Sequence, residues 1–454
     1  MKIDLNCAEK EPLIEIVNSR SKSNSSSEKQ IYNSSSSTRN SRHHRILFIS
    51  SIFALLLFVH IIIFSSVKNY NKREVFGWSK NKSRDISDYV FPNENTTIIE
   101  PSNLCRSPEN IFLLIVVCSS AANFEARQTI RETWGNVSEF NYPMFQKLHG
   151  SHNSSYLQAN NKHWKQYIEK SSSDNSSSQS NINLATFRVS VVFLLGISPT
   201  DMSDEQQYEI NYENEVYGDI IQENFLDSYN NLTLKSILML KWVTNNCADK
   251  VKYIMKSDDD TFINVPNLLH VLLGGTVPLY KSTLPYYDKT TIYVTKSKNR
   301  LSETKHLLLG YKFCNAKKIS NTNSKWYVPN YLYSGDYYPD YLSGTAYLFT
   351  FDTALMLYNG SISVPLFHLE DVYLTAFVAE KVKIKRTHHP LFFYQYNTKD
   401  KCSMIGMISQ HQISPAEMQE LYNFVTNLTH IHCAVPQKNF MSMKLNLAQR
   451  KRCH

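Results

Sequence analysis

The sequence predicts an α/β fold with a mostly parallel central sheet, preceded by one transmembrane helix. Continuous apolar runs such as Ile111–Cys118 are typical of strands that are buried on both faces. Segments with helical spacing separate these runs, and such alternation indicates a sheet with helices on both faces. The run at 46–67 has 22 residues with no ionisable group except His60, which is long enough to cross a bilayer as a helix.

The expected strands and helices follow one another from residue 111 onward. Strands are rich in apolar residues without interruption, whereas the helices place them three or four residues apart. We expect strands at Ile111–Cys118, Arg188–Gly196, Val251–Met255 and Tyr347–Thr350, and helices at Arg127–Trp134, Leu232–Thr244 and Val372–Glu380.

Composition excludes some classes of function. The net charge is +8, and the 48 Lys and Arg are spread along the chain rather than gathered in one block, so we expect no nucleic-acid partner. Only 12 residues are glycine, and neither G-x-G-x-x-G nor G-x-x-x-x-G-K-[ST] occurs. If the protein binds a nucleotide diphosphate, groups other than backbone amides must neutralise it.

The apolar run at 46–67 is expected to be a retained anchor. A cleaved signal peptide is the alternative, but its apolar region would be shorter and would not follow 45 other residues. Three Lys and Arg lie in the 15 residues before the run and five in the 15 after it, so the positive-inside rule does not favour a cytosolic N-terminus.

Sequons and cysteines favour the opposite orientation to the charge count, with the larger part of the chain in an oxidising, glycosylating lumen. Seven of the eight cysteines follow the apolar run, and Cys118 is the best candidate for a buried free thiol, while the pairing of the others stays open. The sequon at Asn175 lies in a serine tract and could arise by chance, but chance explains the full set of sequons less well. Eight sequons follow the run, at Asn81, Asn95, Asn136, Asn153, Asn175, Asn231, Asn359 and Asn427.

These observations divide the chain. The N-terminal part is polar and Ser-rich, and a second Ser- and Asn-rich stretch interrupts the folded region. We expect a cytosolic disordered tail at 1–45, the anchor at 46–67, a stem at 68–108, a folded lumenal domain at 109–435 with a surface insertion at 149–183, and a C-terminal tail at 436–454.

Three consecutive aspartates, Asp258, Asp259 and Asp260, closely follow the expected strand Val251–Met255. Ligands of open α/β sheets bind at the carboxyl ends of strands. Residues two apart in an extended chain face the same side, so Asp258 and Asp260 can converge on Mn²⁺ or Mg²⁺ while Asp259 points away. A solvated acidic turn is the alternative interpretation.

Four further groups are candidates for chemistry. Glu370 and Asp371 open an expected helix, where acids commonly cap the dipole, although one could act as a general base toward a sugar hydroxyl. Arg127 and Arg131 share a helix face and could meet a phosphate or form salt bridges. His411 is one of 15 histidines, and spacing alone favours a structural or exposed residue over a metal ligand. Aromatic residues that could stack on sugars, or simply fill the core, are Trp134, Trp326, Tyr338 and Tyr341.

Five motifs in order over roughly 110–435 resemble those of the β-1,3-glycosyltransferase family, which includes β-1,3-galactosyltransferases and β-1,3-N-acetylglucosaminyltransferases. Each motif is weak alone, but the ordered set is specific. Arg127–Trp134 resembles R-x-x-I-R-x-T-W, Asp227–Lys235 resembles D-x-Y-x-N-L-T-x-K, Lys256–Asp260 resembles K-x-D-x-D, Tyr338–Tyr347 resembles Y-P-x-Y-x-x-G-x-x-Y, and Glu370–Tyr373 resembles E-D-V-Y.

The resemblance implies a GT-A fold, a Golgi type II membrane protein and an inverting transfer that makes a β-1,3 linkage. It implies that Asp371 is the base, beside Glu370, and that the metal is held by Asp260, Asp258 and His411, the last ahead of a family-like S-x-x-P-x-E stretch. It implies a donor site made of Arg127, Arg131, Asp227, Asn231, Lys235, Lys256, Asp258 and Asp259, and an acceptor side with Tyr341, Gly344 and Trp326.

Two departures stand beside the last motif. After E-D-V-Y the family usually has x-G, whereas Leu374 and Thr375 follow here. A cysteine common in the next helical turn is replaced by the stretch 376–379. The change at Thr375 bears on packing at the acceptor side more than on the donor, and no expected catalytic group is lost.

The sequence therefore predicts a metal-dependent transfer of galactose from UDP-galactose to a glycan of a glycoprotein or glycolipid. The nearest alternative transfers N-acetylglucosamine or N-acetylgalactosamine with the same machinery. Alternatives of other classes are a membrane-bound sugar-binding protein with an inactive site and a metal-dependent hydrolase, for which histidine-rich ligand sets are commoner.

Overall fold

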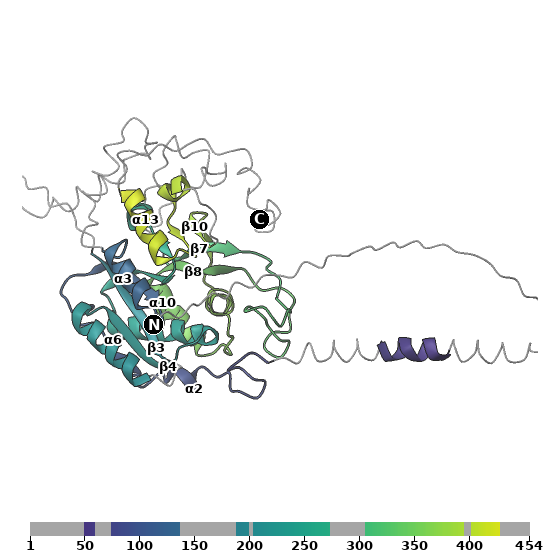
Figure 1. Cartoon of the computed structure of the whole chain (residues 1–454). Coiled ribbons are helices and arrows are strands. Elements are labelled where there is room, and N and C mark those ends of the chain that lie inside the picture. Colours follow the sequence, from purple (N-terminus) through teal and green to yellow (C-terminus); the bar gives the residue numbers. More distant parts are fainter. Residues whose placement is uncertain are drawn as a thin grey trace, which may run out of the picture. The chain divides into compact units, whose positions relative to one another are not determined.

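The computed structural model describes residues 50–59, 74–136, 188–198, 203–272, 305–394 and 401–426, within two compact units, Met1–Lys68 and Asn69–His454 (Figure 1). The expected tail at 1–45, the insertion at 149–183 and the C-terminal tail at 436–454 lie outside the described residues. Of the expected anchor, residues 50–59 are described; they are helical and exposed. Among the helices that are described, none combines the length and apolar character that crossing a membrane requires.

The second unit is built on an eight-stranded sheet in the order β1-β4-β3-β2-β5-β8-β7-β9. The central pairs β4–β3, β3–β2 and β2–β5 are parallel, as is β7–β9, whereas β8 runs antiparallel to both neighbours and β1 antiparallel to β4. The predicted mostly parallel α/β sheet is therefore confirmed. Its strands are β1 (Thr97–Ile99), β2 (Ile111–Cys118), β3 (Val189–Ile197), β4 (Ile220–Leu226), β5 (Val251–Asp258), β7 (Leu308–Phe313), β8 (Tyr341–Thr350) and β9 (Thr387–His388).

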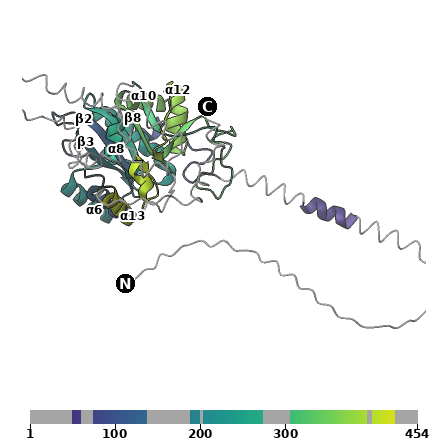
Figure 2. The same cartoon turned by 90° about the horizontal axis from the view of Figure 1, so that it is seen from above.

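Alternate residues of β2 enter two separate apolar layers, as expected for a strand buried on both faces. Leu114 and Val116 pack with α7 (Leu232–Asn246) and α10 (Phe351–Ser361). Ile115 and Val117 pack on the other face. Helices on that face are α3 (Phe124–Glu132), α8 (Val265–Leu272) and α13 (Pro415–Thr426), and Figure 2 shows α10 and α13 on opposite sides of the strands.

The predicted elements agree with the structure except at several boundaries. The bounds of β2 are as predicted, α7 extends two residues further, and the helix expected at Arg127–Trp134 begins at Phe124. The strand expected at Tyr347–Thr350 starts six residues earlier, because Tyr341 and the residues after it pair with β7. The helix expected at Val372–Glu380 consists of α11 (Glu370–Val372), a π-helical turn (Tyr373–Val378) and α12 (Ala379–Lys381).

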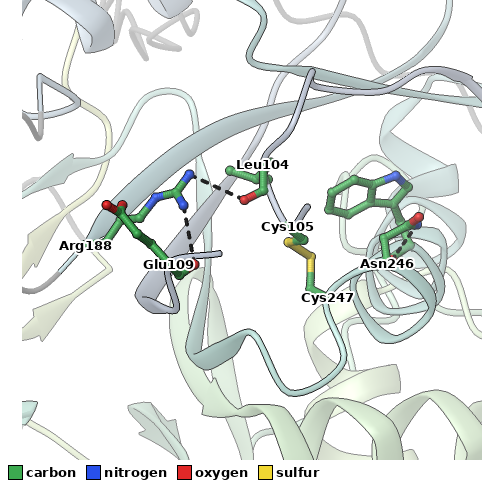
Figure 3. The surroundings of a disulfide bond; sticks show 7 residues. Leu104, Cys105, Glu109, Arg188, Asn246 and Cys247 are labelled. Carbon is green, nitrogen blue, oxygen red and sulfur yellow. Dashed lines mark hydrogen bonds between the residues drawn. A yellow bond between two sulfur atoms is a disulfide. The ribbon is translucent and has the colours of Figure 1, made fainter. Parts of the chain in front are cut away.

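The described part of the expected stem, 74–108, is folded rather than extended. Its apolar residues Trp78, Ile86 and Val90 are buried in the layer that contains α7, and it carries α2 (Ser87–Val90) and β1. A disulfide joins Cys105 to Cys247 at the end of α7, 142 residues away (Figure 3). Cys118 is a buried free cysteine, as predicted.

Candidate active site

The three aspartates lie where β5 leaves the sheet, and their side chains diverge as the alternation predicts. Asp259 turns toward the segment after β2, where its Oδ2 accepts hydrogen bonds from Ser119 Oγ at 2.7 Å and Asn123 Nδ2 at 2.9 Å. Burial raises the pKa of Asp259, and these two donors oppose that rise. Asp258 and Asp260 face the other way, toward His411.

A small second sheet brings His411 to the aspartates. β6 (Phe262–Ile263) begins two residues after Asp260. It pairs with β11 (Ser409–Gln410), which directly precedes His411, and β10 (Phe392–Phe393) completes this sheet. The Ile413 amide donates to the Asp260 carbonyl at 2.9 Å. Residues about 150 positions apart in the chain are thus fixed side by side through backbone pairing.

Asp258, Asp260 and His411 have the geometry of a metal-ligand set. One ligand atom from each lies within 4.8 Å of the others. His411 Nδ1 lies 3.1 Å from the Tyr394 carbonyl, which fixes the proton on Nδ1 and turns Nε2 toward Asp260 Oδ1 at 3.2 Å. Burial lowers the pKa of His411, but the Asp260 carboxylate raises it above its ordinary value. Two carboxylates and an imidazole fit a divalent cation such as Mn²⁺ or Mg²⁺.

Glu370 and Asp371 open α11 and lie against β8 at Gly344. A Cβ added to Gly344 would lie 3.2 Å from both Asp371 Cβ and Glu370 Oε2, so any larger residue would crowd these two acids. The Gly344 and Val372 amides hydrogen-bond Asp371. Burial, with the nearby Glu370 carboxylate, raises the pKa of Asp371 to about 7. A half-buried carboxylate of this pKa suits a general base.

Lys256 joins the two groups of acids. Its buried ammonium donates to Asp258 Oδ1 at 2.5 Å and to the Gly344 carbonyl at 2.5 Å, and it lies 3.7 Å from Glu370 Oε2. Burial lowers the pKa of Lys256, but Asp258 and Glu370 raise it well above the ordinary value, so the ammonium stays charged. The Tyr347 hydroxyl donates to Glu370 Oε1 at 2.6 Å. Lys256 is thus engaged with protein groups on both sides, and its contact with a donor stays a prediction.

Arg127 is buried, and all five N–H groups of its guanidinium are engaged within the protein. It binds both carboxylate oxygens of Glu213 at 2.8 and 2.7 Å, Ser119 Oγ, and two backbone carbonyls. Arg131 pairs with Glu213 and Asp219, and its guanidinium lies 4.0 Å from the ring centroid of Tyr217. The sequence left open whether the two arginines meet a phosphate or form salt bridges, and in the structure both form salt bridges.

The second expected donor motif forms a buried support under the site. The Lys235 ammonium is buried, and it donates to Asp227 Oδ2 at 2.7 Å and to the Ser119 carbonyl at 2.5 Å. Asn231 Nδ2 donates to the Leu226 carbonyl at 2.8 Å. These residues hold the ends of β2 and β4 together.

Tyr229, which was not among the residues expected at the site, lies beside Trp326. Its side chain is 45% exposed and is hydrogen-bonded to Trp326, which is 49% exposed, and burial together with Asp371 raises the pKa of Tyr229 to about 12. Lys325 Nζ lies 5.5 Å from the centroid of the Tyr229 ring and 4.9 Å from that of Trp326. Tyr341 packs on Phe313 at 5.1 Å between ring centroids. The signal for Tyr229 was its place in the D-x-Y motif.

Comparison with known proteins identifies the family of the chain. A family model described as galactosyltransferase matches residues 171–390. β-1,3-Galactosyltransferase 1 of Mus musculus and that of Homo sapiens are each 30% identical over 362 residues, which cover 80% of this chain and 86% of the relative. β-1,3-Galactosyltransferase 2 of Homo sapiens is 28% identical over 341 residues, 74% of this chain and 64% of the relative. The chain is a hexosyltransferase that belongs to the β-1,3-galactosyltransferase family.

Proposed function

We propose that this enzyme transfers galactose from UDP-galactose to a glycan hydroxyl in β-1,3 linkage, with inversion, on a GT-A fold. The observation that carries the proposal is Lys256, whose one ammonium contacts the metal-ligand candidate Asp258 and lies beside Glu370, the neighbour of Asp371. The cation site and the base are therefore held at one end of the sheet. The names of the relatives support galactose as the sugar.

Asp258, Asp260 and His411 would hold Mn²⁺ or Mg²⁺. When bound, the cation supplies positive charge that stabilises a departing diphosphate. Because the chain has no glycine-rich phosphate loop, this acidic site takes its place. Asp259 shapes the same turn through its bonds to Ser119 and Asn123.

Asp371 takes the proton from the acceptor hydroxyl as that oxygen attacks the anomeric carbon of the donor. The hydroxyl approaches from the face opposite UDP, which inverts the configuration. The exposed rings of Tyr229 and Trp326, with Tyr341 nearer the core, provide apolar faces on which an acceptor sugar can stack. Glu370, buried between Lys256 and Tyr347, positions Asp371 rather than contacting the acceptor.

The run at 46–67 supports a membrane anchor, and the sequons after it support a Golgi location with the catalytic unit in the lumen. The Cys105–Cys247 disulfide suits such an oxidising compartment. Acceptors on glycoproteins or glycolipids pass through that compartment.

The test uses the full-length chain in detergent with Mn²⁺ and a panel of UDP-sugars. We expect UDP release from UDP-galactose that depends on an added glycan acceptor and yields a β-1,3-linked product. Chelation by EDTA and the substitution Asp260→Ala should both abolish release. Acceptor-dependent release from UDP-N-acetylglucosamine or UDP-N-acetylgalactosamine instead would identify the alternative donor, and UDP binding without any release would indicate an inactive sugar-binding protein.

A further inference from the structure

Thr375 occupies the position where the family motif usually has glycine, and its hydroxyl is fully engaged. The residue is buried with no exposed surface. Its Oγ1 donates to the Asp371 carbonyl at 2.6 Å and accepts the Leu342 amide at 2.8 Å. One hydroxyl therefore ties the backbone of Asp371 to β8.

The Leu342 amide lies in the part of β8 that is not paired with β5. Pairing between β5 and β8 runs from Thr350 to Ala346 and stops there, so residues 341–345 extend beyond β5. The Thr375 hydroxyl accepts a β8 amide from this stretch. Because Gly344 lies two residues along the same strand and touches Asp371, the hydroxyl fixes the spacing between Asp371 and the glycine that packs against it.

The turn around Thr375 is π-helical over Tyr373–Val378. A threonine hydroxyl that bonds the carbonyl four residues earlier competes with the helical backbone and bends the helix. Single π-helical turns are often found at functional sites. The bond from Thr375 to the Asp371 carbonyl lies at the start of this turn, so it couples the shape of the helix to the direction of the Asp371 side chain.

From these contacts we infer that Thr375 is a positioning residue for the base, which holds Asp371 against Gly344 through its hydroxyl. The inference rests on the proposed role of Asp371. The Thr375 hydroxyl bonds Asp371 and Leu342, so we expect it to act on the chemical step and not on binding of the nucleotide. Misplacement of a catalytic group by about 1 Å can slow a reaction by roughly 100-fold.

The experiment compares Thr375→Ser and Thr375→Val in the full-length enzyme, with Thr244→Val as the matched control. Thr244 makes the same type of bond, to the Leu240 carbonyl at 2.8 Å, near the far end of α7. We expect Thr375→Ser to keep kcat within about twofold and Thr375→Val to lower it by roughly tenfold or more, since only serine retains the hydroxyl. The donor KM and Mn²⁺-dependent UDP binding should be unchanged in both, and Thr244→Val should keep kcat.

Two outcomes would overturn the inference: a wild-type kcat in Thr375→Val, or an equal loss of kcat in the serine and valine variants. Thermal unfolding of each variant separates a loss of fold from a loss of positioning, because the serine variant tests the hydroxyl in a chain that still folds. Asp371→Asn is measured alongside. If it retains transfer, the proposed base is wrong; if it loses transfer while Thr375→Val does not, only the inference about Thr375 fails.

Discussion

Gly344→Ala isolates the contact between β8 and the acids of α11. Gly344 does not have a left-handed backbone, so alanine adds no backbone strain. Its new methyl group would lie 3.2 Å from Asp371 Cβ and Glu370 Oε2, and 3.6 Å from Asp371 Cγ. These contacts are a few tenths of an ångström too short, and overpacking of this kind costs about 1–3 kcal/mol of stability. The shift that relieves them falls on Asp371, so kcat should drop by roughly 10-fold to 100-fold.

The matched control for this change is Gly310→Ala on β7. Its added Cβ would lie 3.2 Å from Tyr347 Cβ and 3.3 Å from the Ala346 carbonyl, which is a similar degree of crowding away from the Asp371 carboxylate. Steady-state kcat and acceptor KM, urea unfolding and UDP binding are measured for both variants. Equal stability losses with a kcat loss confined to Gly344→Ala are predicted. A Gly344→Ala enzyme with the kcat of Gly310→Ala would refute the reasoning.

Three further predictions follow from the same geometry. Burial and Glu370 raise the pKa of Asp371 to about 7, and a base works only when deprotonated, so kcat/KM should rise as pH increases through about 7; a profile flat from pH 5 to 9 would contradict this. His411→Ala should raise the Mn²⁺ concentration for half-maximal activity by at least about tenfold, because one of the three ligand candidates is lost, while the circular dichroism spectrum stays unchanged. Replacement of Cys105 and Cys247 by serine should lower the free energy of unfolding by about 5 kcal/mol, the chain-entropy value for a loop of this length, and unchanged urea unfolding would count against it.

The sequence was sufficient for features that depend on local pattern. The apolar run Ile111–Cys118 became β2 without a change of bounds, because continuous burial on both faces leaves a direct mark in composition. The opposite directions of Asp258 and Asp259 followed from the two-residue period of an extended chain. The convergence of His411 with these aspartates was expected only from the family resemblance, since the pairing of β6 with β11 leaves no local signal.

Other features depended on partners that the sequence does not place. The sequence allowed Arg127 and Arg131 to bind either a phosphate or a carboxylate. In the structure both bind the carboxylate of Glu213 on α6 (Ser203–Tyr217), about 85 residues away. The expected stem was polar on average, but a few apolar residues such as Trp78 suffice to anchor it to α7. The average polarity of the expected stem gives no sign of these residues, because burial depends on individual side chains.

The central claim is that Asp371 is the base of a metal-dependent transfer, and Asp371→Asn tests it most directly. The full-length variant is assayed for Mn²⁺-dependent UDP binding and for galactose transfer from UDP-galactose. The account predicts that UDP affinity is retained and that kcat falls by roughly 100-fold to 10,000-fold, as expected for loss of a general base. Transfer at the wild-type rate, or loss of UDP binding together with transfer, would contradict it.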